Sequence, residues 1–285
     1  MKIPSIGYVF FLIFISITIV SSSPDHGEVE DETQFNYEKK GEKGPENWGR
    51  LKPEWAMCGK GNMQSPIDLT DKIVLIDHNL GYLRSQYLPS NATIKNRGHD
   101  IMMKFEGGNA GLGITINGTE YKLQQIHWHS PSEHTLNGKR FVLEEHMVHQ
   151  SKDGRNAVVA FFYKLGKPDY FLLTVLQPQP SYLERYLKRI TDTHESQEFV
   201  EMVHPRTFGF ESKHYYRYIG SLTTPPCSEN VIWTISKEMR TVTLKQLIML
   251  RVTVHDQSNS NARPLQRKNE RPVALYIPTW HSKLY

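Results

Sequence analysis

Short segments rich in β-branched and aromatic residues, separated by Gly, Asn and Pro, constrain the fold of this chain most strongly. Clear examples cover residues 101–105, 114–116, 121–129, 141–150 and 157–165. Such segments are typical of β-strands. The last is apolar almost throughout, which is typical of a central strand covered on both faces. These segments predict a mainly β fold with few helices.

Two segments show a helical pattern instead. In Ser181–Ile190 the apolar residues recur at the spacing of one helix face, and Thr243–Leu250 is a second candidate helix. The sequence contains no internal repeat and no Pro- or Ser-rich linker, so its 285 residues are expected to form one main domain.

The composition excludes several classes of protein. Hydrophobic residues make up 38% of the chain and charged residues 22%, which excludes collagen-like, low-complexity and wholly disordered chains. The net charge of +4 is small and evenly spread, and no basic cluster alternates with aromatic residues. We therefore expect no nucleic-acid partner.

The N-terminus has the pattern of a secretory signal. Lys2 precedes an apolar run from Ile6 to Val20, and small residues follow at 21–23. The alternative is a membrane anchor, but this run is shorter than the roughly 20 residues that span a bilayer. We predict a signal peptide at 1–23, a flexible acidic lead-in at 24–34, and no membrane contact after cleavage.

Three further features agree with entry into the secretory pathway. Asn91 and Asn117 each begin a glycosylation sequon. Cys58 and Cys227 stand far apart with no CxxC or zinc-finger spacing, so in an oxidising compartment we expect them to pair. The alternative is two buried free thiols.

A candidate metal site lies in two strand-like segments. His127 and His129 are two positions apart, so on a strand both imidazoles project from the same face. His146 lies in the segment 142–149, which follows an Asn-Gly pair at 137–138, a strong hairpin signal. If the two segments pair antiparallel, His146 lies across from the other two imidazoles. Three neutral imidazoles with a fourth position open are typical of a catalytic zinc site.

The same alternation places partners for these imidazoles. Gln125 shares the face of His127, and Glu144 shares the face of His146, so each can accept the second ring N–H of a ligand. An HxH pair alone is more often structural than ligating, and that alternative remains open. The histidines that also fit a purely structural role are His99, His134 and, on the opposite face, His149.

Several motifs together resemble the α-class carbonic anhydrases, most closely those of the plant secretory pathway. They are Gln64-Ser65-Pro66-Ile67, His127-Trp128-His129, Ser132-Glu133-His134-Thr135, Glu144-Glu145-His146-Met147-Val148-His149, Ser221-Leu222-Thr223-Thr224-Pro225-Pro226-Cys227 and Asn261-Ala262-Arg263-Pro264. The resemblance implies a domain at 35–278, followed by a tail at 279–285. It also implies an α+β fold with a large twisted mixed sheet, mostly antiparallel, and peripheral helices.

The resemblance further implies an activity and its residues. It implies reversible hydration of carbon dioxide to bicarbonate and a proton, by attack of a hydroxide on Zn²⁺ held by His127, His129 and His146. Thr223 would accept a hydrogen bond from this hydroxide and donate one to Glu133. The implied substrate-binding residues are Val148, Val158, Leu222, Thr223, Thr224 and Trp233. The implied proton shuttle is His99, and the residues implied to orient the ligands or cavity water are Gln125, Glu144, the carbonyl of Asn261, and Tyr37.

Two other functions remain possible at this point. A cupin-type metal oxidase also has an HxH motif, although the later glycine framework of cupins is missing here. A non-catalytic storage or binding protein on the carbonic anhydrase fold would be expected to lack a zinc ligand, and none is lost. The sequence leaves open the oligomeric state and the final compartment, which is extracellular or the plastid stroma reached by the secretory route.

Overall fold

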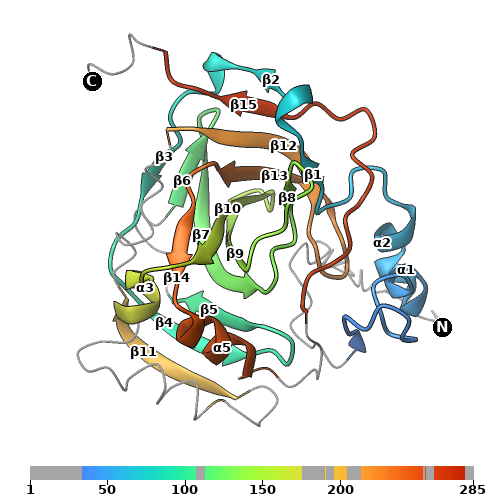
Figure 1. Ribbon diagram of the computed structural model, residues 1–285, viewed down its shortest axis with the longest axis vertical. Coiled ribbons are helices and arrows are strands. Elements are labelled where there is room, and N and C mark those ends of the chain that lie inside the picture. The colour runs from blue at the N-terminus through green and yellow to red at the C-terminus, as the bar shows by residue number, and fades with distance from the viewer. Residues whose placement is uncertain are drawn as a thin grey trace, which may run out of the picture.

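The computed structural model describes residues 34–106, 113–174, 190, 196–203, 213–252, 254 and 260–279. Within these residues the dominant element is one large mixed sheet (Figure 1). Its strands are β2 (Leu75–Ile76), β3 (Arg84–Gln86), β4 (Ser90–Asn96), β5 (Ile101–Phe105), β6 (Gly113–Ile116), β7 (Thr119–His129), β9 (Leu143–Ser151), β10 (Asn156–Leu165), β11 (Gln197–Val203), β12 (Tyr215–Ser221), β13 (Glu229–Ser236), β14 (Arg240–Val242) and β15 (Ala274–Tyr276). A separate pair joins β1 (Asp68–Leu69) to β8 (Thr135–Leu136).

The strand order along the sheet is β11-β4-β5-β7-β9-β10-β13-β12-β15-β2, with β14 beside β10 and β6 linking β3 to β7. Most neighbouring strands are antiparallel. The parallel pairs are β10 with β13, β10 with β14, and β15 with β2. The expected large, mixed, mostly antiparallel sheet is therefore confirmed.

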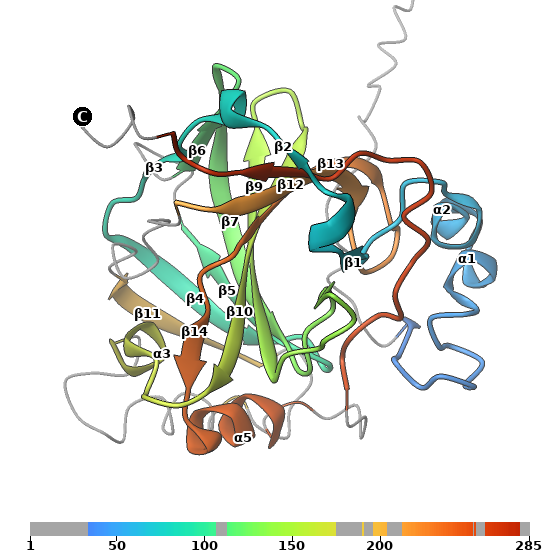
Figure 2. The ribbon, with the colours of Figure 1, turned by 45° about the horizontal axis from the view of Figure 1, so that its top comes forward.

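The helices are short and lie around the sheet, as expected (Figure 2). They are α1 (Trp48–Leu51), α2 (Met57–Lys60), α3 (Tyr170–Thr174) and α5 (Leu244–Val252), with 3₁₀ turns at Pro53–Trp55, Asp71–Ile73 and His78–Leu80. The predicted helix at Thr243–Leu250 corresponds to α5. No described helix is both long enough and apolar enough to cross a bilayer.

The centre of the sheet is covered on both faces. All residues of β10 from Asn156 to Tyr163 are buried, as the apolar run predicted. One core cluster contains Met147, Val159 and Phe161, and a second contains Val148 and Val158 from the same two strands. Because neighbouring residues of a strand point to opposite faces, the sheet separates these two cores.

A disulfide joins Cys58 and Cys227, as expected, and ties the N-terminal part of the chain to the segment after β12. Around it a small cluster of buried side chains includes Phe35, Tyr37 and Trp48. The predicted signal peptide at 1–23 and nearly all of the lead-in, the Ser181–Ile190 helix and the 279–285 tail lie outside the described residues.

Candidate metal centre

Strands β7 and β9 bring the three predicted histidines together. The strands pair antiparallel, with His127 directly opposite His146, as the alternation predicted. A bulge in β7 inserts one extra residue between Leu123 and Gln125. Leu123 therefore packs in the core on the far face, whereas Gln125, His127 and His129 point the other way.

One nitrogen of each imidazole is held by a hydrogen bond. Nδ1 of His127 lies 2.8 Å from Oε1 of Gln125, and Nδ1 of His129 lies 2.7 Å from the carbonyl oxygen of Asn261. Nε2 of His146 lies 2.9 Å from Oε1 of Glu144. These contacts orient the rings so that His127 Nε2, His129 Nε2 and His146 Nδ1 are the nitrogens left to face a common point.

The three remaining nitrogens form a donor set that fits a metal ion. Each histidine offers one ligand atom within 4.8 Å of those of the other two, and His127 Nε2 lies 3.2 Å from His146 Nδ1. His129 Nε2 is buried and has no hydrogen-bond partner. Burial, and then the neighbouring imidazoles, lower the pKa of His127 well below its ordinary value. Neutral imidazoles are the form that binds zinc, so the site suits a three-nitrogen zinc centre.

The sequence motif around Glu133 places a second buried carboxylate at the centre. The main-chain N–H of Arg263 donates to Glu133 Oε1 at 2.8 Å. Glu133 Oε2 accepts no hydrogen bond and lies 3.6 Å from His129 Nε2 and 4.0 Å from His146 Nδ1. Thr223 is buried on the segment after β12 and does not hydrogen-bond to Glu133 in this structure. Glu133 Oε2, the oxygen that Thr223 was expected to contact, is thus available to accept a hydrogen bond.

A chain of buried polar groups extends behind His146. Glu144 also accepts a hydrogen bond from the main-chain N–H of His134 at 2.8 Å. Its carboxylate lies 2.7 Å from Nδ1 of the His134 ring. His134 Nε2 then contacts the hydroxyl of Tyr218, which contacts Ser65. Burial raises the pKa of Glu144, but its contacts with His134 and His146 overcome this effect and hold the pKa well below its usual range. Sequence reasoning missed this role of His134, although it lies in one of the quoted motifs.

An apolar surface lies beside the three imidazoles. Val148, Val158 and Trp233 stand opposite one another on β9, β10 and β13, and Leu222 packs in the same cluster. The ring centroid of Trp233 is 4.9 Å from that of His146. The four residues expected to form an apolar wall are therefore neighbours in the fold. The buried hydroxyl of Thr224 has no hydrogen-bond partner.

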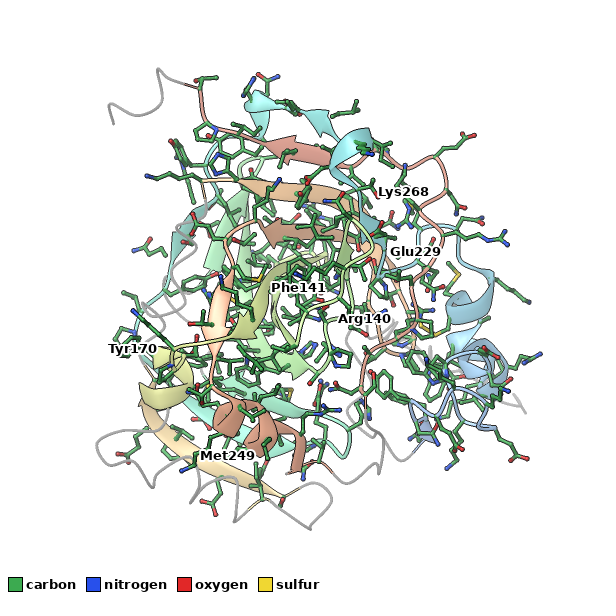
Figure 3. The ribbon with its side chains drawn as sticks, in the orientation of Figure 1. Arg140, Phe141, Tyr170, Glu229, Met249 and Lys268 are labelled. Atoms are coloured by element: carbon green, nitrogen blue, oxygen red, sulfur yellow. A yellow bond between two sulfur atoms is a disulfide. The ribbon has the colours of Figure 1, made fainter. Side chains whose placement is uncertain are left out.

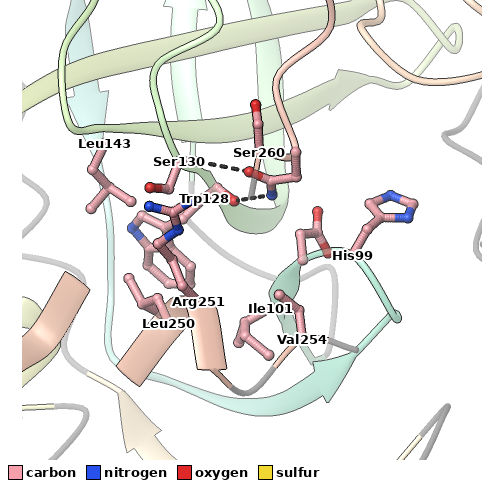
Figure 4. A pocket seen from close by; sticks show the side chains of 11 residues that line it. His99, Ile101, Trp128, Ser130, Leu143, Leu250, Arg251, Val254 and Ser260 are labelled. Carbon is pink, nitrogen blue, oxygen red and sulfur yellow. Dashed lines mark hydrogen bonds between the residues drawn. The ribbon is translucent and has the colours of Figure 1, made fainter. Parts of the chain in front are cut away.

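His99 is more enclosed than a solvated loop histidine would be. It is 2% exposed, and its ring lies 4.6 Å from that of Phe35 and 5.0 Å from that of Tyr37, centroid to centroid. Burial lowers its pKa well below the ordinary value. His99 also lines a pocket of about 20 Å³, large enough for one water molecule (Figure 4). Across this pocket, Asn261 hydrogen-bonds to the main chain of Trp128 and Ser130.

The two sequons lie at different positions on the surface of the sheet. Asn117 is exposed in the Asn-Gly turn between β6 and β7, with φ of 50° followed by 76° at Gly118. Asn91 is half-buried at the start of β4. Asn117 is therefore the more accessible of the two side chains, and glycosylation at either remains a prediction.

Comparisons with known proteins agree with this arrangement. A family model described as eukaryotic-type carbonic anhydrase matches residues 43–277. The chain is 96% identical over its full 285 residues to the full length of Alpha carbonic anhydrase 5 of Arabidopsis thaliana. It is also 42% identical over 272 residues, 94% of this chain and 92% of the relative, to Carbonic anhydrase Nec1 of Nesocodon mauritianus.

Solved structures share the fold. A crystal structure of dioscorin complexed with ascorbate aligns with a TM-score of 0.79 at 41% identity, covering 86% of this chain and 99% of the other. The α-carbonic anhydrase from Thermovibrio ammonificans, in complex with the inhibitor sulfanilamide, aligns with a TM-score of 0.73 at 33% identity, covering 87% and 99%.

Proposed function

Because the chain belongs to the eukaryotic-type carbonic anhydrase family, we propose that it hydrates carbon dioxide reversibly to bicarbonate and a proton, using one Zn²⁺ ion held by His127, His129 and His146. The convergence of three ring nitrogens on one point is the observation that carries this proposal. When bound there, zinc supplies the Lewis acidity that makes a nucleophile available from water near neutral pH, for which carbonic anhydrases are a standard example. The family membership excludes the cupin-type alternative.

Thr223 and Glu133 orient the attacking oxygen. In the reacting enzyme the hydroxyl of Thr223 would donate its proton to Glu133 Oε2, the buried oxygen that has no hydrogen-bond partner in this structure. Because its own proton is donated to Glu133, the Thr223 hydroxyl can only accept a hydrogen bond from the attacking oxygen. Thr223 thus selects one orientation of the nucleophile, with a lone pair towards the substrate.

The apolar wall holds carbon dioxide beside the nucleophile. Val148, Val158, Leu222 and Trp233 contribute no charge to this surface, which suits a substrate without net charge or dipole. The unpartnered hydroxyl of Thr224 lies at the same segment as Thr223 and is available to hold the bicarbonate product.

His99 moves the product proton out of the site. Burial lowers the pKa of the enclosed ring, which keeps it neutral and weakens it as a base, so it takes up the proton where water reaches it. Phe35 and Tyr37 cover the ring, so release of the proton to buffer requires either displacement of these side chains or water in the adjacent pocket. We expect His99→Ala to slow turnover in weak buffer and added imidazole to restore part of the rate. An unchanged turnover rate would remove His99 from this role.

We also propose that the protein follows the secretory route, because the disulfide agrees with an oxidising compartment and residues 1–23 have the pattern of a signal peptide. A storage or binding protein without catalysis is the alternative to an active enzyme, and relatives named dioscorin are similar to this chain at 42% and 43% identity.

Stopped-flow measurement of carbon dioxide hydration by the purified protein distinguishes an active enzyme from a storage or binding protein. We expect activity that is lost when zinc is removed and returns when zinc is added back. We also expect sulfanilamide, the inhibitor bound to the Thermovibrio ammonificans relative, to bind and inhibit the zinc-loaded protein. A protein that carries zinc at this site and still fails to hydrate carbon dioxide would contradict the proposal and favour the storage function.

A further inference from the structure

Several motifs that are distant in the sequence meet at the guanidinium of Arg263. The proposed function assigns no role to this side chain. This side chain is 1% exposed. Its Nη1 donates to Oε1 of Gln64 at 2.9 Å and to the carbonyl oxygen of Ser65 at 2.8 Å, and its Nη2 donates to the carbonyl oxygen of Cys58 at 2.9 Å. Burial lowers the pKa of Arg263 to about 10, so the group stays charged at neutral pH.

The main chain of the same residue controls one oxygen of Glu133. The N–H of Arg263 donates to Glu133 Oε1, so the position of this N–H determines where Oε2 points. Oε2 lies between His129 and His146, close to the point where the ring nitrogens converge. Since the guanidinium is fixed by three oxygen acceptors, the backbone that presents this N–H is fixed as well.

The second connection from Arg263 runs to the segment that carries Thr223. Gln64, which accepts from Arg263, donates through Nε2 to the carbonyl oxygen of Cys227 at 3.1 Å and to Oε1 of Glu229 at 3.0 Å (Glu229 is labelled in Figure 3). The N–H of Cys227 closes a turn by donating to the carbonyl oxygen of Thr224 at 2.9 Å. The disulfide holds this turn to Cys58, whose carbonyl also accepts from Arg263.

We propose that Arg263 is a positioning residue for the hydration reaction, because it fixes Glu133 and the Thr223–Thr224 segment relative to each other. Both partners of the proposed Thr223–Glu133 hydrogen bond lie outside the strands, Glu133 between β7 and β8 and Thr223 between β12 and β13. A displacement of about 1 Å in such an oriented pair is enough to cost a large part of the rate. This inference rests on the proposed function, since the pair acts only in that reaction.

The matched comparison is Arg263→Met against Arg271→Met. Arg271 is also buried, and its guanidinium donates only to carbonyl oxygens, those of Gln64, Arg267, Lys268 and Ile219. None of these contacts reaches Glu133. Both substitutions are expected to lower the unfolding temperature of the protein. Loss of stability alone therefore does not distinguish a positioning role from a structural one.

Two readouts do distinguish them: the kcat and KM of carbon dioxide hydration, and the sulfanilamide dissociation constant of the zinc-loaded protein measured by calorimetry. For Arg263→Met we expect kcat to fall at least about tenfold with little change in KM, because removing one preorganised contact typically costs 10²- to 10³-fold. We expect sulfanilamide to bind at least about tenfold more weakly. Arg263→Lys, which keeps the charge, should recover part of both losses, and Arg271→Met should change both quantities much less than Arg263→Met does.

The proposal is overturned if folded Arg263→Met matches Arg271→Met in both readouts. If Arg263→Met does not fold, Gln64→Met decides, since it removes the side-chain link from Arg263 to Cys227 and Glu229 but keeps the hydrogen bonds of Arg263 to Ser65 and Cys58. A clear decrease in both kcat and sulfanilamide affinity supports the proposal, and unchanged values overturn it. An inactive wild-type protein would contradict the proposed function instead, and the comparison of sulfanilamide affinities would still show whether Arg263 holds Glu133 and the Thr223–Thr224 segment in place.

Discussion

Removal of the Cys58–Cys227 disulfide has a large predicted effect on stability. The bond joins residues 169 positions apart, so it restricts the unfolded chain over more than half of its length. The chain-entropy model assigns such a loop about 5 kcal/mol of the free energy of unfolding. For a domain of this size, each kcal/mol corresponds to roughly 2–4 °C in the unfolding temperature. We therefore expect Cys58→Ala/Cys227→Ala to unfold about 10–20 °C below the wild type.

Differential scanning calorimetry of both proteins in non-reducing buffer measures this difference. The wild type treated with a dithiol reductant is the control, because it loses the bond but keeps every side chain, and its unfolding temperature should approach that of the double variant. At each of these buried positions alanine removes only the sulfur atom. A difference of less than about 3 °C would refute the reasoning, because it would show that the unfolded chain is hardly restricted by the bond.

Two further predictions concern residues on β9. Glu144→Gln removes the charge that holds His146, so it should weaken zinc binding about 10- to 100-fold in a chelator competition assay. Glu145→Gln, on the opposite face of the strand, should leave zinc binding unchanged. Equal losses of zinc affinity in the two variants would contradict the role of Glu144 in orienting His146. Burial lowers the pKa of His149 from 6.5 to about 4, so the unfolded state binds more protons between these pH values. The contribution of His149 to stability is therefore fully present above pH 6.5 and is lost as the pH falls to about 4, by up to about 3 kcal/mol. Denaturant titrations of the zinc-free protein at pH 7.5 and 4.5 should show a smaller pH difference for His149→Phe than for the wild type, and identical pH differences would refute this explanation.

Local patterns in the sequence were sufficient for strands β5, β6, β7, β9 and β10 and for the three imidazoles. Alternation along 121–129 and 142–149 placed His127 and His146 on one face, because the period of a strand is independent of the rest of the fold. The Asn-Gly pair at 137–138 indeed forms a tight turn with positive φ at both residues, but within the long loop between β7 and β9. The Asn-Gly pair at 117–118 carried the same signal for the β6–β7 hairpin and was interpreted only as part of a sequon.

Contacts between distant segments had no local signal. The covering of His99 depends on Phe35, which lies more than 60 positions earlier in the chain. The acceptors of the Arg263 guanidinium lie about 200 positions away from it. The hydrogen bonds from Glu144 through His134 to Tyr218 depend on how β9 and β12 are placed across the sheet. Such contacts follow from the assembled fold and not from the periodicity of any one element.

The metal content of purified protein tests the central claim most directly. We predict one zinc ion per chain for the wild type and for His149→Asn, and essentially none for His146→Asn after dialysis against a weak chelator. The two histidines lie on the same strand and are similarly buried, but their rings point to opposite faces of the sheet. Retention of zinc by His146→Asn, or a wild type that hydrates carbon dioxide at full rate without zinc, would contradict the assignment.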